Sequence, residues 1–239
     1  MSMFTTEQIK TAFKEEQQKM QKAGKKAEKP GLALALIILG NSSIGKKQRS
    51  GEDFAQHPMH VATQNIRSRT KRVIAILHDV IEDSRKENPE YKWTLEDLKE
   101  IGFSKRIRKA IKGLTKQPDE LYLDFIVRCG LSGDDAIKVK IEDIAHNSDP
   151  TRYRTLSLTS KQQKKQALYN LAYHYLVDLK KKRDDGTPYN TPGTSIVDYI
   201  KSRKEYKDQA GLVNALLDEF SSEKGRLKVK KGLAKNFNP

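Results

Sequence analysis

Apolar side chains recur at helical spacing through most of this chain, and this pattern constrains its fold more than any other feature. In residues 70–83, one face collects five apolar side chains: Val73, Ile74, Leu77, Val80 and Ile81. Periodicity of this kind predicts a helix that packs against a core. The alternating pattern typical of strands never extends beyond a few residues, and no segment repeats. The sequence therefore predicts an all-α fold.

The same spacing, together with capping residues, predicts further helices. They cover residues 6–23, 32–39, a short stretch from Pro58, stretches from Thr94 and Ser104, and residues 119–129, 134–146 and 160–182. The apolar stretch 32–39 is expected to be buried on most sides. A turn-rich segment at 184–194 precedes one or two more helices in 195–220 and a basic tail from 221.

These elements predict a compact multi-helix bundle with a helical C-terminal extension. We expect three parts along the chain. Residues 1–31 form an N-terminal helix and linker, residues 32–183 form the main domain, and residues 184–239 form a linker, a helical extension and a basic tail.

The chain is strongly basic. Its 239 residues include 46 Lys and Arg against 31 Asp and Glu, which gives a net charge of +15. Such an excess is typical of a nucleic-acid surface, of a site for a small polyanion, or of a plain lysine-rich exterior. Charge alone does not choose among these three. Disorder is disfavoured because the apolar residues, 36% of the chain, fall in periodic blocks.

Three features that the sequence lacks bear on where the protein is expected to be located. The longest apolar run, residues 32–39, is far shorter than the roughly 20 residues of a membrane span. The N-terminus lacks the basic-then-apolar pattern of a secretory leader. Cys129 is the single cysteine, so neither an intramolecular disulfide nor a multi-cysteine zinc site is possible. We expect a cytoplasmic protein with no membrane partner.

Four polar residues interrupt the core-forming segment AILHDVIEDS at residues 75–84. They are His78, Asp79, Glu82 and Asp83. Spacings of three and four residues place them on neighbouring faces of a helix. Three acids and an imidazole beside apolar residues are costly to desolvate without a purpose such as a bound cation. The adjacent His-Asp pair also offers two metal ligands.

Two further elements carry the same residue types. Asp143 and Asn147 lie four residues apart on a predicted helix with apolar flanks, and His57 precedes Pro58. Each has an ordinary structural explanation as well. Asp143 can pair with Lys140, and a lone histidine at a helix start is more often structural than a ligand.

Taken together, the ordered series His57, His78-Asp79 and Asp143 resembles the HD superfamily of metal-dependent phosphohydrolases. The surrounding segments RSGE…HP, AILHDVIEDS, KGLTK and KIEDIAHN resemble, in order, the hydrolase-domain motifs of RelA/SpoT-type alarmone enzymes. The similarity covers about residues 32–147 and weakens toward about 179. No synthetase half is present, and the chain looks closer to the small stand-alone members.

This resemblance implies a manganese-dependent hydrolase that acts on the 3′-pyrophosphate of guanosine tetra- or pentaphosphate, within an HD-domain bundle. By motif position, the implied metal ligands are His57, His78, Asp79 and Asp143. The implied acids that orient and deprotonate the attacking water are Glu82 and Asp83. The implied contacts to nucleotide or phosphate are Arg49, Ser50 and Asn147.

Two departures from the family pattern bear on the substrate. Gln48 stands where the family usually has a basic residue, and Ser148-Asp149-Pro150 replaces the common Met-Arg-Thr. One alternative is therefore an HD phosphatase that acts on another phosphorylated nucleotide, such as NADPH. Another is a basic nucleic-acid-binding or interaction protein with a vestigial site, although no nucleic-acid recognition motif supports it. The segment KGLTK is explained equally well by substrate contact and by an ordinary helix end.

Overall fold

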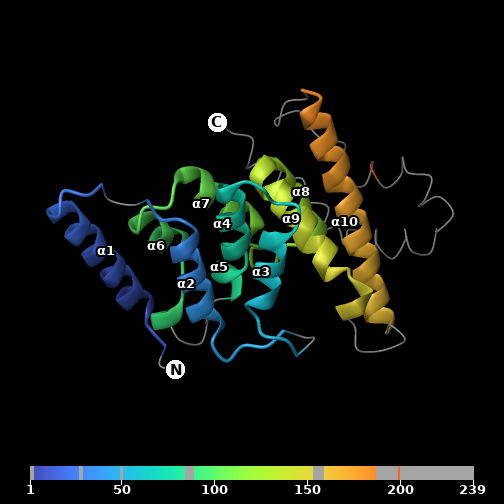
Figure 1. Ribbon diagram of the computed structural model, residues 1–239. Coiled ribbons are helices and arrows are strands. Elements are labelled where there is room, and N and C mark those ends of the chain that lie inside the picture. Colours follow the sequence, from blue (N-terminus) through green and yellow to red (C-terminus); the bar gives the residue numbers. More distant parts are fainter. Residues whose placement is uncertain are drawn as a thin grey trace. The chain divides into compact units, whose positions relative to one another are not determined.

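Figure 1 shows the computed structural model of the chain, which is all-α as predicted. The structure describes residues 3–26, 29–48, 51–83, 89–152 and 159–186, together with Tyr199. Within these ranges the only β-type pairing is an isolated bridge between Lys47 and Asp53. The predicted C-terminal helices and basic tail lie outside the described residues, apart from Tyr199.

Most helix ends fall within a few residues of the predicted positions. The α-helices are α1 (Thr6–Lys22), α2 (Leu32–Ser43), α3 (Gln56–Thr63), α4 (Arg69–Leu77), α5 (Val80–Asp83), α6 (Leu95–Glu100), α7 (Lys105–Leu114), α8 (Tyr122–Leu131), α9 (Asp134–Asn147) and α10 (Ser160–Asp184). Two short 3₁₀ helices are η1 (Pro89–Tyr91) and η2 (Pro150–Arg152).

The described residues divide into two compact units that interleave along the chain. The first unit comprises those in Met1–Thr115 and Ser132–His146, and the second comprises those in Lys116–Leu131 and Asn147–Pro239. The first unit therefore contains α1 to α7 and nearly all of α9. The second contains α8 and α10.

Helix α4 is the centre of the first unit. It packs against α2, α3 and α7 (Figure 1). Its last five residues, Val73 to Leu77, are all buried. At its start the Ser68 hydroxyl accepts a hydrogen bond from the Lys71 backbone N–H, which caps the helix. Burial of these last five residues fixes the position of the residues that follow the C-terminal end of α4.

The predicted single helix at 70–83 is interrupted, and this corrects the sequence-based expectation. Helix α4 ends at Leu77, a turn contains His78 and Asp79, and α5 begins at Val80. The His78 Nδ1 atom lies 2.7 Å from the Ala75 carbonyl oxygen, so the imidazole competes for a carbonyl at the end of the helix. The His-Asp pair therefore lies in the turn between α4 and α5.

Helix α2 is less buried than its apolar sequence suggests. Residues Leu34, Ala35, Ile38 and Leu39 are buried, whereas 56% of Ile37 is exposed. The helix packs against α4 along one stripe only, because an α-helix presents residues three and four apart on the same face. The expectation that residues 32–39 are buried on most sides is therefore wrong for the outer face.

Helix α1 is fixed to α6 by a buried lysine. The Lys10 side chain is only 5% exposed, and its ammonium contacts the carboxylates of Glu7, Asp97 and Glu100. Burial disfavours the charged amine, but hydrogen bonds to these three acids, led by Glu100, outweigh it and raise the pKa of Lys10. The three acids thus already surround a cation supplied by the chain itself.

In the second unit, α8 packs against α10. A Cβ at Gly130 would come within 2.8 Å of the Leu179 side chain, so this glycine allows the two helices to approach closely. Helix α8 begins at Tyr122, three residues after Asp119, whose φ of 58° lies in the left-handed region. Cys129 is buried in this helix, where it packs as a small apolar side chain.

Candidate metal centre

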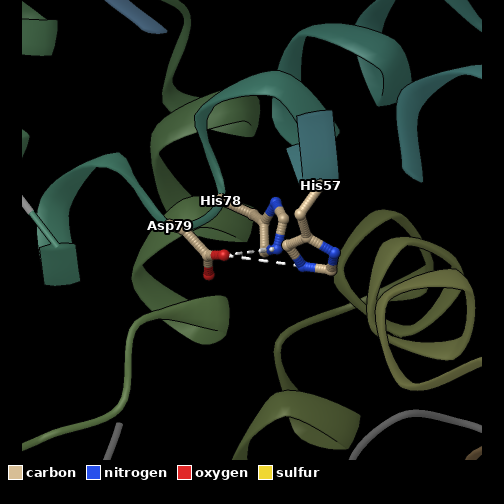
Figure 2. A group of neighbouring side chains, drawn as sticks. All are labelled: His57, His78 and Asp79. Carbon is tan, nitrogen blue, oxygen red and sulfur yellow. Dashed lines mark ion pairs between the residues drawn. The ribbon is translucent and has the colours of Figure 1, made fainter. Parts of the chain in front are cut away.

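Three segments that are distant in sequence bring four predicted side chains together in the first unit. His57 comes from α3, His78 and Asp79 come from the turn between α4 and α5, and Asp143 comes from α9. The His57 Nε2 atom lies 2.9 Å from Asp143 Oδ1 and 3.6 Å from Asp79 Oδ2. The His78 Nε2 atom lies 3.2 Å from Asp79 Oδ2 and 3.7 Å from Asp143 Oδ1. Figure 2 shows how Asp79 faces both imidazoles.

Ion pairs at the start of α9 help to place Asp143. Asp134 accepts a hydrogen bond from Lys71 of α4. Asp135 forms a bidentate pair with Arg106 of α7, with N–O distances of 2.5 and 2.8 Å. Because Asp143 lies about two turns further along the same helix, these contacts set its distance from the end of α4.

The cluster holds its carboxylates ionised. Burial opposes ionisation of Asp143, but the Lys140 ammonium, 2.7 Å away, a hydrogen bond from His57 and the charge of nearby His78 overcome it. They hold the pKa of that carboxyl well below its usual range. Burial likewise opposes ionisation of Asp79, but His78 and His57 lower its pKa. Lys140 therefore does pair with Asp143, and this pair is part of the cluster rather than an alternative to it.

His78 presents a nitrogen suited to a metal. The Ala75 carbonyl can only accept, so His78 Nδ1 donates to it and Nε2 is the nitrogen that faces the cluster. The Nε2 atom is buried, and within the described residues it has no hydrogen-bond partner of suitable geometry although Asp79 lies 3.2 Å away. An imidazole held in this way by a backbone carbonyl is the usual arrangement of a metal-ligating histidine.

The donor set fits a divalent cation. Two imidazole nitrogens and two carboxylates suit borderline to hard divalent ions, and His57, His78 and Asp79 can each direct one ligand atom to a shared point. Burial disfavours an imidazolium at His78, but the negative charges of Asp79 and Asp143 outweigh it and raise its pKa. The same negative charges would stabilise a cation, which competes with that proton.

The structure adds His146, a residue that the sequence patterns did not single out. It lies three residues after Asp143 on α9, and its Nδ1 atom is 2.6 Å from Nδ1 of His57. Its ring also lies nearly parallel to that of His60, with centroids 3.9 Å apart. The spacing of three from Asp143 was the available signal, because residues three apart share a helix face.

The two acids implied as catalytic lie in α5, just beyond the His-Asp turn. Glu82 is half-buried, and Asp83 lies at the end of the helix. The Asp83 backbone N–H donates to the Asp79 carbonyl across 2.8 Å, and the Lys46 ammonium donates to the Asp83 carbonyl. Desolvation by the surrounding protein and the charges of Asp79 and Glu82 raise the pKa of Asp83 to about 6.

This raised pKa predicts that Asp83→Asn stabilises the protein at neutral pH. The folded state favours the protonated acid, so ionised Asp83 costs stability above about pH 6 and nothing below the ordinary value of 3.8. The full shift corresponds to about 3 kcal/mol, which solvent screening at this exposed side chain reduces to about 1 kcal/mol. We expect thermal unfolding about 2–4 °C higher at pH 7.5 and unchanged at pH 4. An equal gain at both pH values would contradict this origin.

The predicted substrate contacts are only partly described. Arg49 and Ser50 lie outside the described residues. Asn147 is the last residue of α9 and belongs to the second unit, where its Oδ1 atom accepts a hydrogen bond from Arg152 across 3.1 Å. Gln48, which replaces the usual basic residue, donates its amide to the backbone carbonyls of its own loop at 3.0 and 3.3 Å.

The glycine of the KGLTK segment has a packing role. Gly113 is buried near the end of α7, and a Cβ there would lie 2.3 Å from the Ser132 hydroxyl oxygen. Real Cβ atoms do not approach so closely, so the residue must be glycine for α7 to pass this segment. Packing against Ser132 thus explains the glycine of this motif.

A scan against protein-family models and a search of curated proteins both find no match for this chain. Within the part of the chain that the structure describes, no helix combines the length and the apolar character needed to cross a membrane.

Proposed function

We propose that the chain is a metal-dependent phosphohydrolase that acts on a phosphorylated nucleotide. The observation that carries this proposal is the convergence of His57, His78, Asp79 and Asp143, with His78 Nε2 buried against carboxylates and lacking a suitable hydrogen bond. The order of the same residues along the chain, which resembles the HD superfamily, supports it.

In this proposal His57, His78, Asp79 and Asp143 hold a divalent cation, most reasonably Mn²⁺. When bound, such a cation supplies Lewis-acid polarisation of a phosphoryl oxygen and lowers the pKa of water. The chain's own contribution is rigid placement. The Ala75 carbonyl orients His78, and Lys140 keeps Asp143 ionised.

Glu82 and Asp83 are the two acids that orient and deprotonate the attacking water. With a pKa of about 6, Asp83 is ionised at neutral pH and still basic enough to accept a proton. The water oxygen attacks the phosphorus nearest the ribose while Asp83 takes the proton of the water, and the bond from that phosphorus to the ribose 3′ oxygen breaks. The 3′ oxygen takes up a proton to become a hydroxyl, and pyrophosphate is released. Glu82 belongs to the same short helix and orients the water. Basic residues of the loop before α3, including Lys46, favour a polyphosphate.

Guanosine tetraphosphate is the first substrate to test, because the motifs resemble those of alarmone hydrolases. A specific observation favours a second candidate. Gln48 donates hydrogen bonds to carbonyls of its own loop, and Asn147 accepts one from Arg152. Two positions that contact the nucleotide in the resembled family therefore make hydrogen bonds within this chain instead. A phosphatase for another phosphorylated nucleotide, such as NADPH, keeps the same chemistry with a different substrate.

A hydrolysis assay on a panel of nucleotides distinguishes these candidate functions. Purified protein with Mn²⁺ is offered guanosine tetraphosphate, guanosine pentaphosphate, NADPH and simple nucleoside phosphates, and the products are separated by chromatography. Pyrophosphate release from guanosine tetraphosphate is the expected result, and orthophosphate release from another nucleotide selects the second candidate. No turnover combined with salt-sensitive binding of RNA or DNA would instead support the nucleic-acid-binding protein with a vestigial site.

A further inference from the structure

We propose that His146 is a positioning residue that directs His57 Nε2 toward the bound cation. This inference rests on the proposed metal-dependent function, and nothing in the motif resemblance assigned it. It concerns the Nδ1 edge of His57, which faces another imidazole and not a carboxylate. His57 is buried in α3, and its Nδ1 atom meets His146 Nδ1 of α9 at 2.6 Å.

The geometry of the two rings is that of a directed hydrogen bond. The planes of His57 and His146 differ by 11°, and their centroids are 4.9 Å apart. That separation is close to the Nδ1–Nδ1 distance plus one ring radius on each side. The two nitrogens therefore face each other along the line between the ring centres, and rotating His57 away from the cluster would break this contact.

His146 can also accommodate a change in which ring nitrogen of His57 carries the proton. A carboxylate can only accept, so at 2.9 Å from Asp143 Oδ1 the His57 Nε2 atom donates, and neutral His57 accepts at Nδ1. Coordination through Nε2 requires the proton to sit on Nδ1 instead. Because an imidazole nitrogen can donate or accept, His146 Nδ1 can partner either arrangement.

The proton balance of this exchange is neutral. The proton on His146 Nδ1 passes to His57 Nδ1, the former Nε2 proton of His57 leaves to solvent, and His146 takes a solvent proton on its own Nε2. No net charge is gained or lost by the pair. A side chain with a single fixed donor could match only one of the two arrangements.

Packing holds His146 in place for this role. Its ring is nearly parallel to the His60 ring, at 18° and 3.9 Å between centroids. His60 and His57 both lie on α3, whereas Asp143 and His146 both lie on α9. Helices α3 and α9 are therefore joined by two contacts of the His57 ring. Its Nε2 atom contacts Asp143 and its Nδ1 atom contacts His146, so both ring nitrogens are held.

Two substitutions separate the hydrogen bond from the ring packing. His146→Asn retains an amide near the Nδ1 position that can donate or accept, and His146→Phe retains the ring against His60 without either capacity. His60→Phe is the matched control, since it changes the neighbouring exposed ring in the same way. Mn²⁺ binding is measured by calorimetry on the full chain, and Co²⁺ binding by its visible absorption spectrum, which reports ligand geometry.

We expect His146→Phe to weaken Mn²⁺ binding by about 10–100-fold and to alter the Co²⁺ spectrum, with Asn within about threefold of the unmodified protein. The His60→Phe control should bind as the unmodified protein does. Unchanged binding in His146→Phe, or equal losses in Phe and Asn, would overturn the positioning role alone. If His146→Phe does not fold, His146→Ala takes its place with the same criteria. Failure of the unmodified protein to bind Mn²⁺ would overturn this inference together with the proposed function.

Discussion

The Asp79→Ala protein is expected to lose Mn²⁺ binding and, with it, nucleotide hydrolysis. Asp79 Oδ2 lies 3.2 Å from His78 Nε2 and 3.6 Å from His57 Nε2, so it is the carboxylate shared by both imidazoles. Its removal leaves two imidazoles and Asp143, whose charge is already matched by Lys140. Turnover should fall by at least about 10³-fold, a loss of about 4 kcal/mol of transition-state stabilisation.

The matched control for this substitution is Asp53→Ala. Asp53 is an exposed aspartate that pairs with Lys47 in the loop before α3 and is not one of the cluster residues. Calorimetric titration with Mn²⁺ and a turnover assay are run on both variants. If Asp79→Ala kept full turnover while binding no Mn²⁺, the site would not be the catalytic centre. If it still bound Mn²⁺ with unchanged affinity, Asp79 would not be a ligand.

The Glu82→Gln protein is expected to bind Mn²⁺ normally and to hydrolyse substrate poorly. Glu82 lies in α5 beside the His-Asp turn, outside the group of side chains that converge on one point. Removing a group that positions or deprotonates water costs about 10²–10⁴-fold in rate. The Gln side chain keeps the size of Glu, so the local packing is retained.

Separating binding from turnover is what makes the Glu82 substitution informative. The measurement pairs an Mn²⁺ titration with steady-state kinetics, and Glu96→Gln on the exposed face of α6 serves as the control. A parallel loss of metal affinity would move Glu82 into the ligand set. Full activity would remove it from the mechanism.

The helices were predictable where local chemistry decides them. Thr94 and Ser104 cap the backbone N–H groups of Asp97 and Ile107, as their positions before apolar periodic segments suggest. Trp93, next to the first cap, is fully buried as an anchor. At these helix starts the capping residue that predicts the helix is also the one that makes the capping hydrogen bond.

The interruption after Leu77 was not predictable from periodicity. The apolar stripe continues through Val80 in register with a single helix, and nothing in the spacing marks a break. At this turn the His78 Nδ1 atom contacts the Ala75 carbonyl, and the spacing of apolar residues does not indicate such a contact. A pattern of residue types carries no information on which nitrogen of an imidazole donates.

The sequence predicted four residues of the candidate site but missed a fifth, His146. The side chains of His57, His78, Asp79 and Asp143 were singled out by residue type and order, and the structure brings them together. His146 was missed because its importance arises only when α9 packs beside α3. Its partner lies 89 residues earlier in the chain.

Restoring turnover with added metal shows whether catalysis by this chain depends on a bound cation. The protein is treated with EDTA, the chelator is removed, and guanosine tetraphosphate and the other nucleotides of the panel are assayed while Mn²⁺ is added back. We expect no hydrolysis before Mn²⁺ is added, and hydrolysis of at least one nucleotide afterwards that saturates with one ion bound per chain. Hydrolysis that persists unchanged without metal, or that stays absent for every nucleotide with Mn²⁺ bound, would contradict this expectation.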